Sequence, residues 1–236
     1  MTTTTSVVRV LSGGAAAAVV RAVQAGFEAE TGARIEATYS AVGAMRERLL
    51  GGAPCDLVIL TRALVLQLIE SGHLVAGSAQ SLGVVKTGIA VPSGHARPAI
   101  GDRAALAAAF RAAREIYFPD PGQATAGIHF MNVLKKLGLE RELAAALRPL
   151  PNGATAMAAM ARSTAERVIG CTQETEINYT AGVDLVGSLP REFELATDYT
   201  LGLCARAPEP ALAQRLAALV AGPASAAVRR QGGFAF

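Results

Sequence analysis

The segment that decides the fold reads Asp56-Leu-Val-Ile-Leu60 and is followed by Thr61 and Arg62. Its four consecutive apolar residues show no polar alternation, which is typical of a strand buried on both faces of a parallel sheet. Residues 62–71 carry apolar side chains at helical spacing, and Gly72 ends the predicted helix. A buried strand that leads directly into a helix is half of a βαβ unit, so the segment predicts an α/β fold.

Two more strand–helix pairs precede this segment. Residues 7–11 predict a strand, which turns at Ser12-Gly13-Gly14 into an apolar helical pattern. Residues 35–39 predict a second strand, and Ser40-Ala-Val-Gly43 leads into a short helix. Each strand-to-helix turn contains Ser, Gly or Thr. In an open parallel sheet such turns lie at the carboxyl edge, where ligands bind.

The rest of the chain continues the alternation of strands and helices. Further strands are predicted at residues 83–91, 115–118, 166–170, 183–188, 195–197 and 200–204. Further helices are predicted at residues 104–114, 127–137, 139–147, 154–163, 174–180, 209–220 and 224–230. Met157 and Met160 have i, i+3 spacing and are expected in a helix core.

The composition excludes several classes of function. The 236 residues carry 22 basic and 19 acidic side chains, a formal charge of +3, which is too small to indicate a nucleic-acid partner. No run of about 18 apolar residues occurs, so direct membrane insertion is not expected. Cys55, Cys171 and Cys204 are widely spaced and do not resemble a disulfide framework. The sequence lacks metal-ligand spacing and a phosphate-binding glycine loop, so no metal and no cofactor are expected.

The N-terminus bears on where the protein works. Residues 1–6 contain no cationic region, and Arg9 interrupts the apolar stretch that follows. This is not the pattern of a secretory signal. The sequence as written is therefore expected to be cytoplasmic, and the alternative is a periplasmic protein whose signal has been removed. Three unpaired cysteines favour the reducing cytoplasm.

Four motifs together resemble a known family. They read Ser12-Gly-Gly-Ala15, Tyr39-Ser-Ala-Val-Gly43, Gly52-Ala-Pro-Cys-Asp-Leu-Val-Ile-Leu60 and Asp120-Pro-Gly-Gln-Ala-Thr-Ala-Gly-Ile-His129. With the order of elements, they resemble the molybdate-binding-like branch of the type II periplasmic solute-binding proteins over residues 7–233. The resemblance implies two α/β lobes with mostly parallel sheets and a ligand cleft between them. Lobe 1 would comprise 1–82 and 190–236, and lobe 2 would comprise 83–189.

The resemblance also implies a mode of binding. Anions in this family sit against helix N-termini, which offer unpaired N–H donors and a positive dipole end. Ser12 with Gly13 and Ser40 match the lobe-1 contacts of the family. Thr125 matches a lobe-2 contact region, and Gln173 and Glu174 lie where the family has its other lobe-2 contact. The alternative for Ser12 and Ser40 is simple helix capping, which needs no ligand.

The residues themselves add four candidates. Thr61 and Arg62 follow the buried strand, and a cation at a helix start is unfavourable unless an anion lies in front of it. Thr87, on the strand 83–91, is preferred to Lys86 because alternation directs the two to opposite faces. Gln123, in the loop before the helix at 127, either lines the cleft or solvates a turn. Arg62 has the alternative of being an exposed surface residue.

The sequence departs from the molybdate pattern in its charges. The segment Cys171-Thr-Gln-Glu-Thr-Glu-Ile177 contains two carboxylates, and Arg62 stands where the molybdate proteins have small residues. Arg binds carboxylates through a two-pronged fork. These changes indicate an organic di- or tricarboxylate rather than a tetrahedral oxyanion. Glu174 and Glu176 could otherwise be a solvated helix start, which is the favoured interpretation for Glu176.

Two functions of different class follow. The first is a binding protein, expected to be monomeric, that closes on a small anion and works with an ABC permease only if exported. The second is a cofactor-independent enzyme, because aconitate isomerases are built on the same fold. Arg62 would then help to clamp the tricarboxylate. Glu174, or less favourably His129, would move the proton, whereas His129 is otherwise a packed or surface residue.

Overall fold

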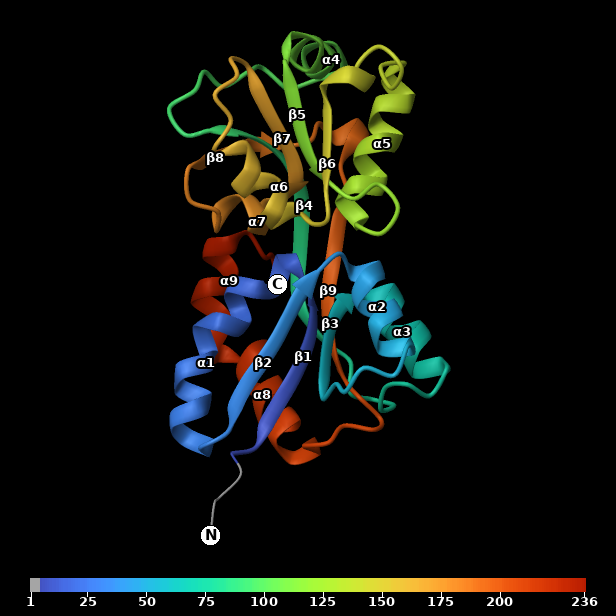
Figure 1. The fold of residues 1–236 in the computed structure, drawn as a ribbon, viewed down its shortest axis with the longest axis vertical. Coiled ribbons are helices and arrows are strands. Elements are labelled where there is room, and N and C mark those ends of the chain that lie inside the picture. Colours follow the sequence, from blue (N-terminus) through green and yellow to red (C-terminus); the bar gives the residue numbers. More distant parts are fainter. Residues whose placement is uncertain (1–4) are drawn as a thin grey trace. The chain divides into compact units, whose positions relative to one another are not determined.

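The computed structural model describes residues 5–236 and shows an α/β chain (Figure 1). Residues 1–4 of the predicted first lobe lie outside the described residues. The chain forms two compact units, Met1–Val84 with Thr197–Phe236, and Val85–Ala196. It passes from one unit to the other within strand β4 (Gln80–Pro92) and back at the start of strand β9 (Ala196–Leu203).

The sheet of unit 1 is mostly parallel. Its order is β2-β1-β3-β9, in which β1, β2 and β3 run parallel and β9 runs antiparallel to β3. The bounds of the first three strands are β1 Val7–Gly13, β2 Arg34–Ser40 and β3 Leu57–Thr61. Residues 57–60 are fully buried, as the continuous apolar run predicts. The fully buried Asp56 accepts hydrogen bonds from the backbone N–H groups of Arg9 and Glu209, both at 2.7 Å, and thereby fixes the start of β3.

Helices cover both faces of this sheet. α1, α8 and α9 lie on one side, and α2 and α3 lie on the other (Figure 1). Their bounds are α1 Ala17–Thr31, α2 Val42–Leu50, α3 Arg62–Glu70, α8 Pro210–Ala221 and α9 Ala226–Gly232, with 3-10 turns at Gly14–Ala16 and Pro223–Ser225. Gly32 ends α1 in the left-handed conformation with φ of 70°.

The sheet of unit 2 is mixed. The parallel strands β7, β5 and β6 lie side by side, and β4 pairs antiparallel with β7 and with β8. The bounds are β5 Glu115–Pro119, β6 Leu147–Leu150, β7 Val168–Gln173 and β8 Val183–Ser188. The predicted helix at 139–147 is wrong. Leu139 and Leu143 are buried from a series of turns, Ala144–Ala146 form a 3-10 turn, and Leu147 joins the sheet opposite Ile116. The i, i+4 spacing of the two leucines imitates a helix.

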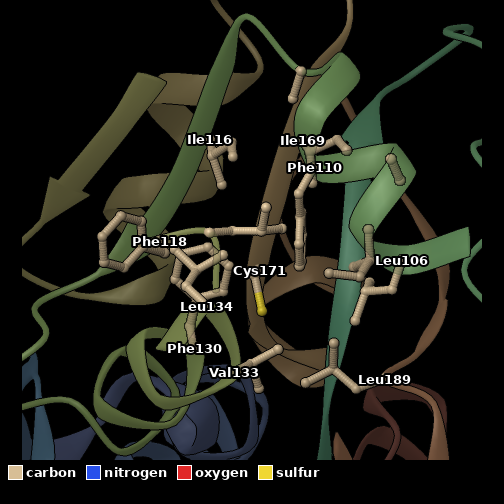
Figure 2. Packing of buried hydrophobic residues seen from close by; sticks show 14 of the residues in the cluster. Leu106, Phe110, Ile116, Phe118, Phe130, Val133, Leu134, Ile169, Cys171 and Leu189 are labelled. Carbon is tan, nitrogen blue, oxygen red and sulfur yellow. The ribbon is translucent and has the colours of Figure 1, made fainter. Parts of the chain in front are cut away.

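Two clusters form the core of unit 2. One packs α4 (Arg103–Ala112) and α5 (Thr125–Leu137) on the sheet through Phe110, Phe118 and Phe130, and it includes Cys171 (Figure 2). The ring of Phe130 lies 5.6 Å from Phe110 and 4.6 Å from Phe118 between centroids. The other cluster contains Met157 and Met160 of α6 (Gly153–Met160), which confirms that these methionines are core residues. The remaining helix is α7, Glu174–Asn178.

The return to unit 1 comes later than predicted. The sequence prediction placed residues 190–196 in lobe 1, whereas the compact units place them in unit 2. The reason is packing, because Phe193, in a 3-10 turn at Arg191–Phe193, belongs to the Phe110 core and its carbonyl oxygen lies 2.7 Å from Nε2 of His129. The strands predicted at 195–197 and 200–204 are one continuous strand, β9.

Within residues 5–236, no single helix is long and apolar enough to cross a membrane. The segments Pro210–Ala221 and Pro223–Gly232 meet the criteria of length and composition only as a pair, bent by 49°. Their apolar side chains Leu216, Ala217 and Val220 are buried in the protein.

Candidate functional site

Three predicted residues lie at the carboxyl ends of neighbouring strands in unit 1. Ser40 ends β2, Gly13 ends β1 and Thr61 ends β3. The parallel register sets Gly13 opposite Ser40, and Ser12 opposite Ile59. The sheet therefore gathers these strand ends at one edge, where the following helices begin.

Ser12 and Ser40 do not cap helices. The residues in the N-cap positions are Gly13, Ala16 and Ala41, and none of them accepts a side-chain cap bond. Ser12 is fully buried and its Oγ donates to the carbonyl of Gly13 at 2.9 Å, while Ser40 is half-buried at the strand end. The capping interpretation is thus wrong for both residues, and their contact with a ligand stays a prediction.

Gly13 occupies a position that no side chain could share. A Cβ at Gly13 would lie 2.8 Å from Cγ1 of Val42 and 3.2 Å from Cε1 of Tyr199. The missing side chain lets the end of β1 approach the first turn of α2. Close backbone approach of this kind is a use of glycine that the sequence motif alone does not reveal.

Arg62 has an acidic neighbour that the sequence analysis missed. It is the first residue of α3, its side chain is 61% exposed, and its Nη1 lies 3.7 Å from Oδ2 of Asp198. Asp198 also accepts hydrogen bonds from Ser81 (2.7 Å) and Thr200 (2.9 Å). The anion expected in front of Arg62 is therefore supplied in part by the protein. A guanidinium has five N–H donors, so one ion pair at 3.7 Å leaves donors for a second carboxylate.

Thr87 and Gln173 face each other in unit 2. They are partners across the antiparallel β4–β7 pair. Thr87 N donates to Leu195 O and Thr87 O accepts from Leu189 N, on the other side of the strand, so Thr87 and Gln173 form a non-hydrogen-bonded pair with close side chains. Both residues are buried, and among the described residues Oγ1 of Thr87 has no hydrogen-bond partner. An unsatisfied buried hydroxyl is costly to the folded state.

Lys86 and Thr87 point to opposite faces, as alternation predicts. Nζ of Lys86 lies 2.6 Å from Oε2 of Glu194, and both side chains are partly exposed. Thr87 and Gln173 instead share the face of Ile89 and Cys171, which belong to the core beneath α4 and α5. The preference for Thr87 over Lys86 as a ligand contact stays a prediction.

α5 begins close to the end of β5. Thr125 is its first residue, so the helix starts two residues before the predicted position at 127. Gly127 packs against the carbonyl oxygens of Pro119 and Asp120, where any Cβ would collide with them. Oδ1 of Asp120 accepts from the N–H groups of Gly122 and Gln123, and Gln123 is half-buried in this loop.

The two candidates for proton transfer differ in their surroundings. Glu174 is half-buried and accepts a hydrogen bond of 2.6 Å from Oγ of Ser188. Nε2 of His129 lies 2.7 Å from the carbonyl of Phe193, which it can approach only as a donor. This bond gives His129 a structural role in holding the 190–196 segment.

Glu176 is a structural carboxyl group that the sequence analysis misjudged. It is buried rather than solvated, and its carboxylate accepts from Oγ1 of Thr172 at 2.6 Å. It also accepts from the backbone N–H groups of Gln173, Gly153 and Ala154, while burial raises its pKa above the ordinary value. The recognisable signal was the spacing from Gln173 to Glu176, which places an acid at N3 of α7, as in a capping box.

Several helices begin without a side-chain cap. α2, α3 and α5 follow β2, β3 and β5 and have no cap bond from the N-cap residue. By contrast, Asp102 accepts from Ala105 N (2.9 Å) at the start of α4, and Asn152 accepts from Thr155 N (2.8 Å) at the start of α6. The uncapped starts present N–H donors and a positive dipole end, which suit an anionic ligand. In residues 5–236 no group of three or more His, Cys, Asp or Glu is arranged to hold a metal ion.

Comparison with known proteins defines the class. The family model for bacterial extracellular solute-binding proteins matches residues 8–235, so the chain belongs to this family. The structure is similar to the periplasmic molybdate-binding protein of Azotobacter vinelandii, with a TM-score of 0.79 and 19% identity over 97% of this chain and 99% of that one. It is also similar to the sulfate-binding protein SubI of Mycobacterium tuberculosis, with a TM-score of 0.72 and 15% identity over 97% and 86% of the two chains. The predicted molybdate-binding-like, two-lobed fold is confirmed.

One curated relative bears on the alternative function. An aconitate isomerase from a Pseudomonas species is 25% identical over 213 residues, which are 88% of this chain and 79% of that protein.

Proposed function

We propose that the protein binds a small organic anion, a di- or tricarboxylate. The observation that carries the proposal is the set of uncapped helix starts at the carboxyl ends of β2, β3 and β5, each accompanied by a hydroxyl residue: Ser40, Thr61 and Thr125. Unpaired N–H groups and hydroxyls replace the hydration of an anion with charge-assisted hydrogen bonds. Membership of the solute-binding family supports this use of the helix starts.

The charged side chains favour a carboxylate over molybdate. Arg62 retains donors beyond its contact with Asp198 and can offer a fork to a carboxylate. Glu174 accepts hydrogen bonds, as it does from Ser188. An acceptor of this kind suits a ligand that also has an O–H group to donate, as citrate does.

A thermal-shift series tests the ligand class. Citrate and trans-aconitate are expected to raise the melting temperature by several degrees, whereas molybdate, tungstate and sulfate are not, because a ligand that binds only the folded state stabilises it. Ser40→Ala and Thr125→Ala should each reduce the shift, since they remove one candidate donor in each unit. Asp102→Ala, in the capped helix α4, is the matched control and should keep the full ligand-induced shift. Stabilisation by molybdate or tungstate alone would contradict the carboxylate proposal.

The second candidate is isomerisation of an unsaturated tricarboxylate. The observation that favours it is the similarity to the Pseudomonas aconitate isomerase. In this version Arg62 helps to hold the substrate and Glu174 takes and returns the proton, without a metal or another cofactor. Incubation with trans-aconitate should then yield the cis isomer, and Glu174→Gln should abolish turnover while leaving the thermal shift. Absence of turnover at high protein concentration would eliminate this candidate.

Location and partners differ between the two candidates. Transport requires an exported protein and an ABC permease that receives the ligand, whereas an isomerase can act alone in the cytoplasm. We infer a monomer in either case. Fractionation of the native host, with size-exclusion chromatography of the purified chain, checks these expectations.

A further inference from the structure

Two cysteines come together at the end of unit 1 opposite to Thr61. Cys55 lies just before β3, and Cys204 lies just after β9. The antiparallel register pairs Leu57 with Leu203, and Cys204 N donates to Asp56 O at 3.0 Å. Residues far apart in the sequence are therefore held side by side by the ladder that joins the two strands.

The two thiols line one cavity. It has a volume of about 410 Å³ and is also bordered by Leu49, Pro54, His73 and Arg206. Cys55 is 4% exposed and Cys204 is 5% exposed, so both residues are buried at the wall of this cavity. A volume of about 30 Å³ per water molecule means that small polar solutes fit inside it.

The pair is chemically asymmetric. The hydrogen bond between the thiols lowers the pKa of Cys55, and the hydrogen bonds that its sulfur accepts from backbone groups of Leu11 and Leu57 act in the same direction. The same thiol–thiol bond and burial raise the pKa of Cys204. Cys55 is thus the more acidic thiol of the pair, and in the structure its Sγ donates to the carbonyl oxygens of Arg9 (3.7 Å) and Leu57 (3.3 Å). Cys171 differs from both, because it lies in the aromatic core of unit 2, where burial raises its pKa.

We propose that Cys55 and Cys204 form an oxidisable dithiol, which a small peroxide entering this cavity converts into a disulfide. The Cys55 thiolate attacks one peroxide oxygen, the O–O bond breaks, and the leaving oxygen takes up a proton and departs as water or alcohol. The sulfur of Cys204 then attacks the Cys55 sulfenic acid, its proton leaves with the sulfenic oxygen as water, and the S–S bond forms. Two thiols are oxidised and one peroxide is reduced.

The disulfide would change the stability of unit 1. It would covalently join the loop before β3 to the segment after β9 and close a very long loop. Long-loop cross-links restrict the unfolded chain most, so the melting temperature should rise by about 5–10 °C on oxidation. A dithiol reductant should reverse the change.

Peroxide treatment followed by peptide mass spectrometry tests this proposal. Native protein exposed to hydrogen peroxide should lose two free thiols and yield a linked peptide that contains Cys55 and Cys204. Cys171→Ala is the matched control and should behave like the unmodified protein, because Cys171 lies in the core. Cys204→Ala should stop the reaction at a Cys55 sulfenic acid, which a 1,3-diketone probe captures.

The outcomes separate the proposal from simple thiol damage. A linked Cys55–Cys204 peptide together with the reversible rise in melting temperature supports it. Oxidation of Cys55 to the sulfinic acid without a cross-link, an equal reaction of Cys171, or unreactive thiols would each overturn it. If Cys204→Ala folds poorly, Cys204→Ser provides the same test with a hydroxyl that preserves the size of the side chain.

Discussion

The starts of α6 and α7 contrast with those of α2, α3 and α5. The first two helices share a buried carboxylate, Glu176, which accepts hydrogen bonds from Gly153 and Ala154 of α6 and from Gln173 at the start of α7. The other three have no side-chain cap. One fold thus contains helix starts satisfied by a buried carboxyl group of its own and starts that have no such side-chain acceptor.

The contrast shows what an anion does at a helix N-terminus in this chain. At α6 and α7 the acceptor is the buried side chain of Glu176, which belongs to the protein itself and so contributes to folding. At α2, α3 and α5 the donors can serve a ligand, because nothing in the N-cap residue competes for them. The same physical interaction is structural in one region and available for function in the other.

Removal of the Glu176 carboxyl group should give the largest loss of stability. Glu176→Ala leaves Thr172 and three backbone N–H groups without their acceptor in a buried site, so the free energy of unfolding should fall by about 3–5 kcal/mol. Urea denaturation measures this change. Glu176→Gln keeps one carbonyl acceptor and the size of the side chain, and should lose less. Equal losses for both variants would show that packing, rather than the acceptor, holds the helix starts.

The free energy of unfolding should depend on pH through Glu176. The pKa of Glu176 is raised in the folded protein by burial, so the folded state binds this proton more tightly than the unfolded chain does. The stabilisation is therefore fully present below the unfolded carboxyl pKa and is lost as the pH rises through the folded pKa. Urea titrations at several pH values should show this fall, and Glu176→Gln should flatten it. An identical pH profile in the variant would contradict the assignment.

The ordinary side-chain caps should contribute moderately. Asp102→Ala and Asn152→Ala each remove one bond from a cap side chain to a backbone N–H group, at 2.9 Å and 2.8 Å. Each should reduce the free energy of unfolding by about 1 kcal/mol. Thermal and urea denaturation provide the measurement, and unchanged stability would mean that solvent replaces these caps without cost.

Substitution at an uncapped helix start should have the smallest effect on stability. Thr61 is the N-cap residue of α3 but makes no side-chain cap bond, so Thr61→Ala should change the free energy of unfolding by no more than about 0.5 kcal/mol. Urea denaturation without ligand measures it. A loss comparable to that of Asp102→Ala would show that Thr61 caps α3 in solution and would weaken its assignment to a ligand.

The sequence predicted the elements better than the polar contacts within them. The apolar run before Thr61 identified a buried strand because continuous burial excludes polar alternation, and the strand-to-helix turns followed from Gly and Ser. The segment at 139–147 failed because Leu139 and Leu143 are spaced like a helix although turns bury them. The spacing of apolar residues along the chain does not indicate whether a neighbouring strand has a free edge with which the segment can pair.

The candidate site was predictable only in part. The positions of Ser40, Gly13 and Thr61 at strand ends follow from the alternation of strands and helices. The contact of Arg62 with Asp198 depends on which distant segments meet, so neither local spacing nor residue type could reveal it. The spacing from Gln173 indicated a capping role for Glu176, but its burial depends on tertiary packing.

Gly153 carries a consequence for how this sequence can evolve. A Cβ at this position would collide with Oε2 of Glu176 and with Oγ1 of Thr172. Any side chain at 153 is therefore excluded while Glu176 and Thr172 remain. The three positions form an epistatic unit, in which the order of mutations decides which sequences remain accessible.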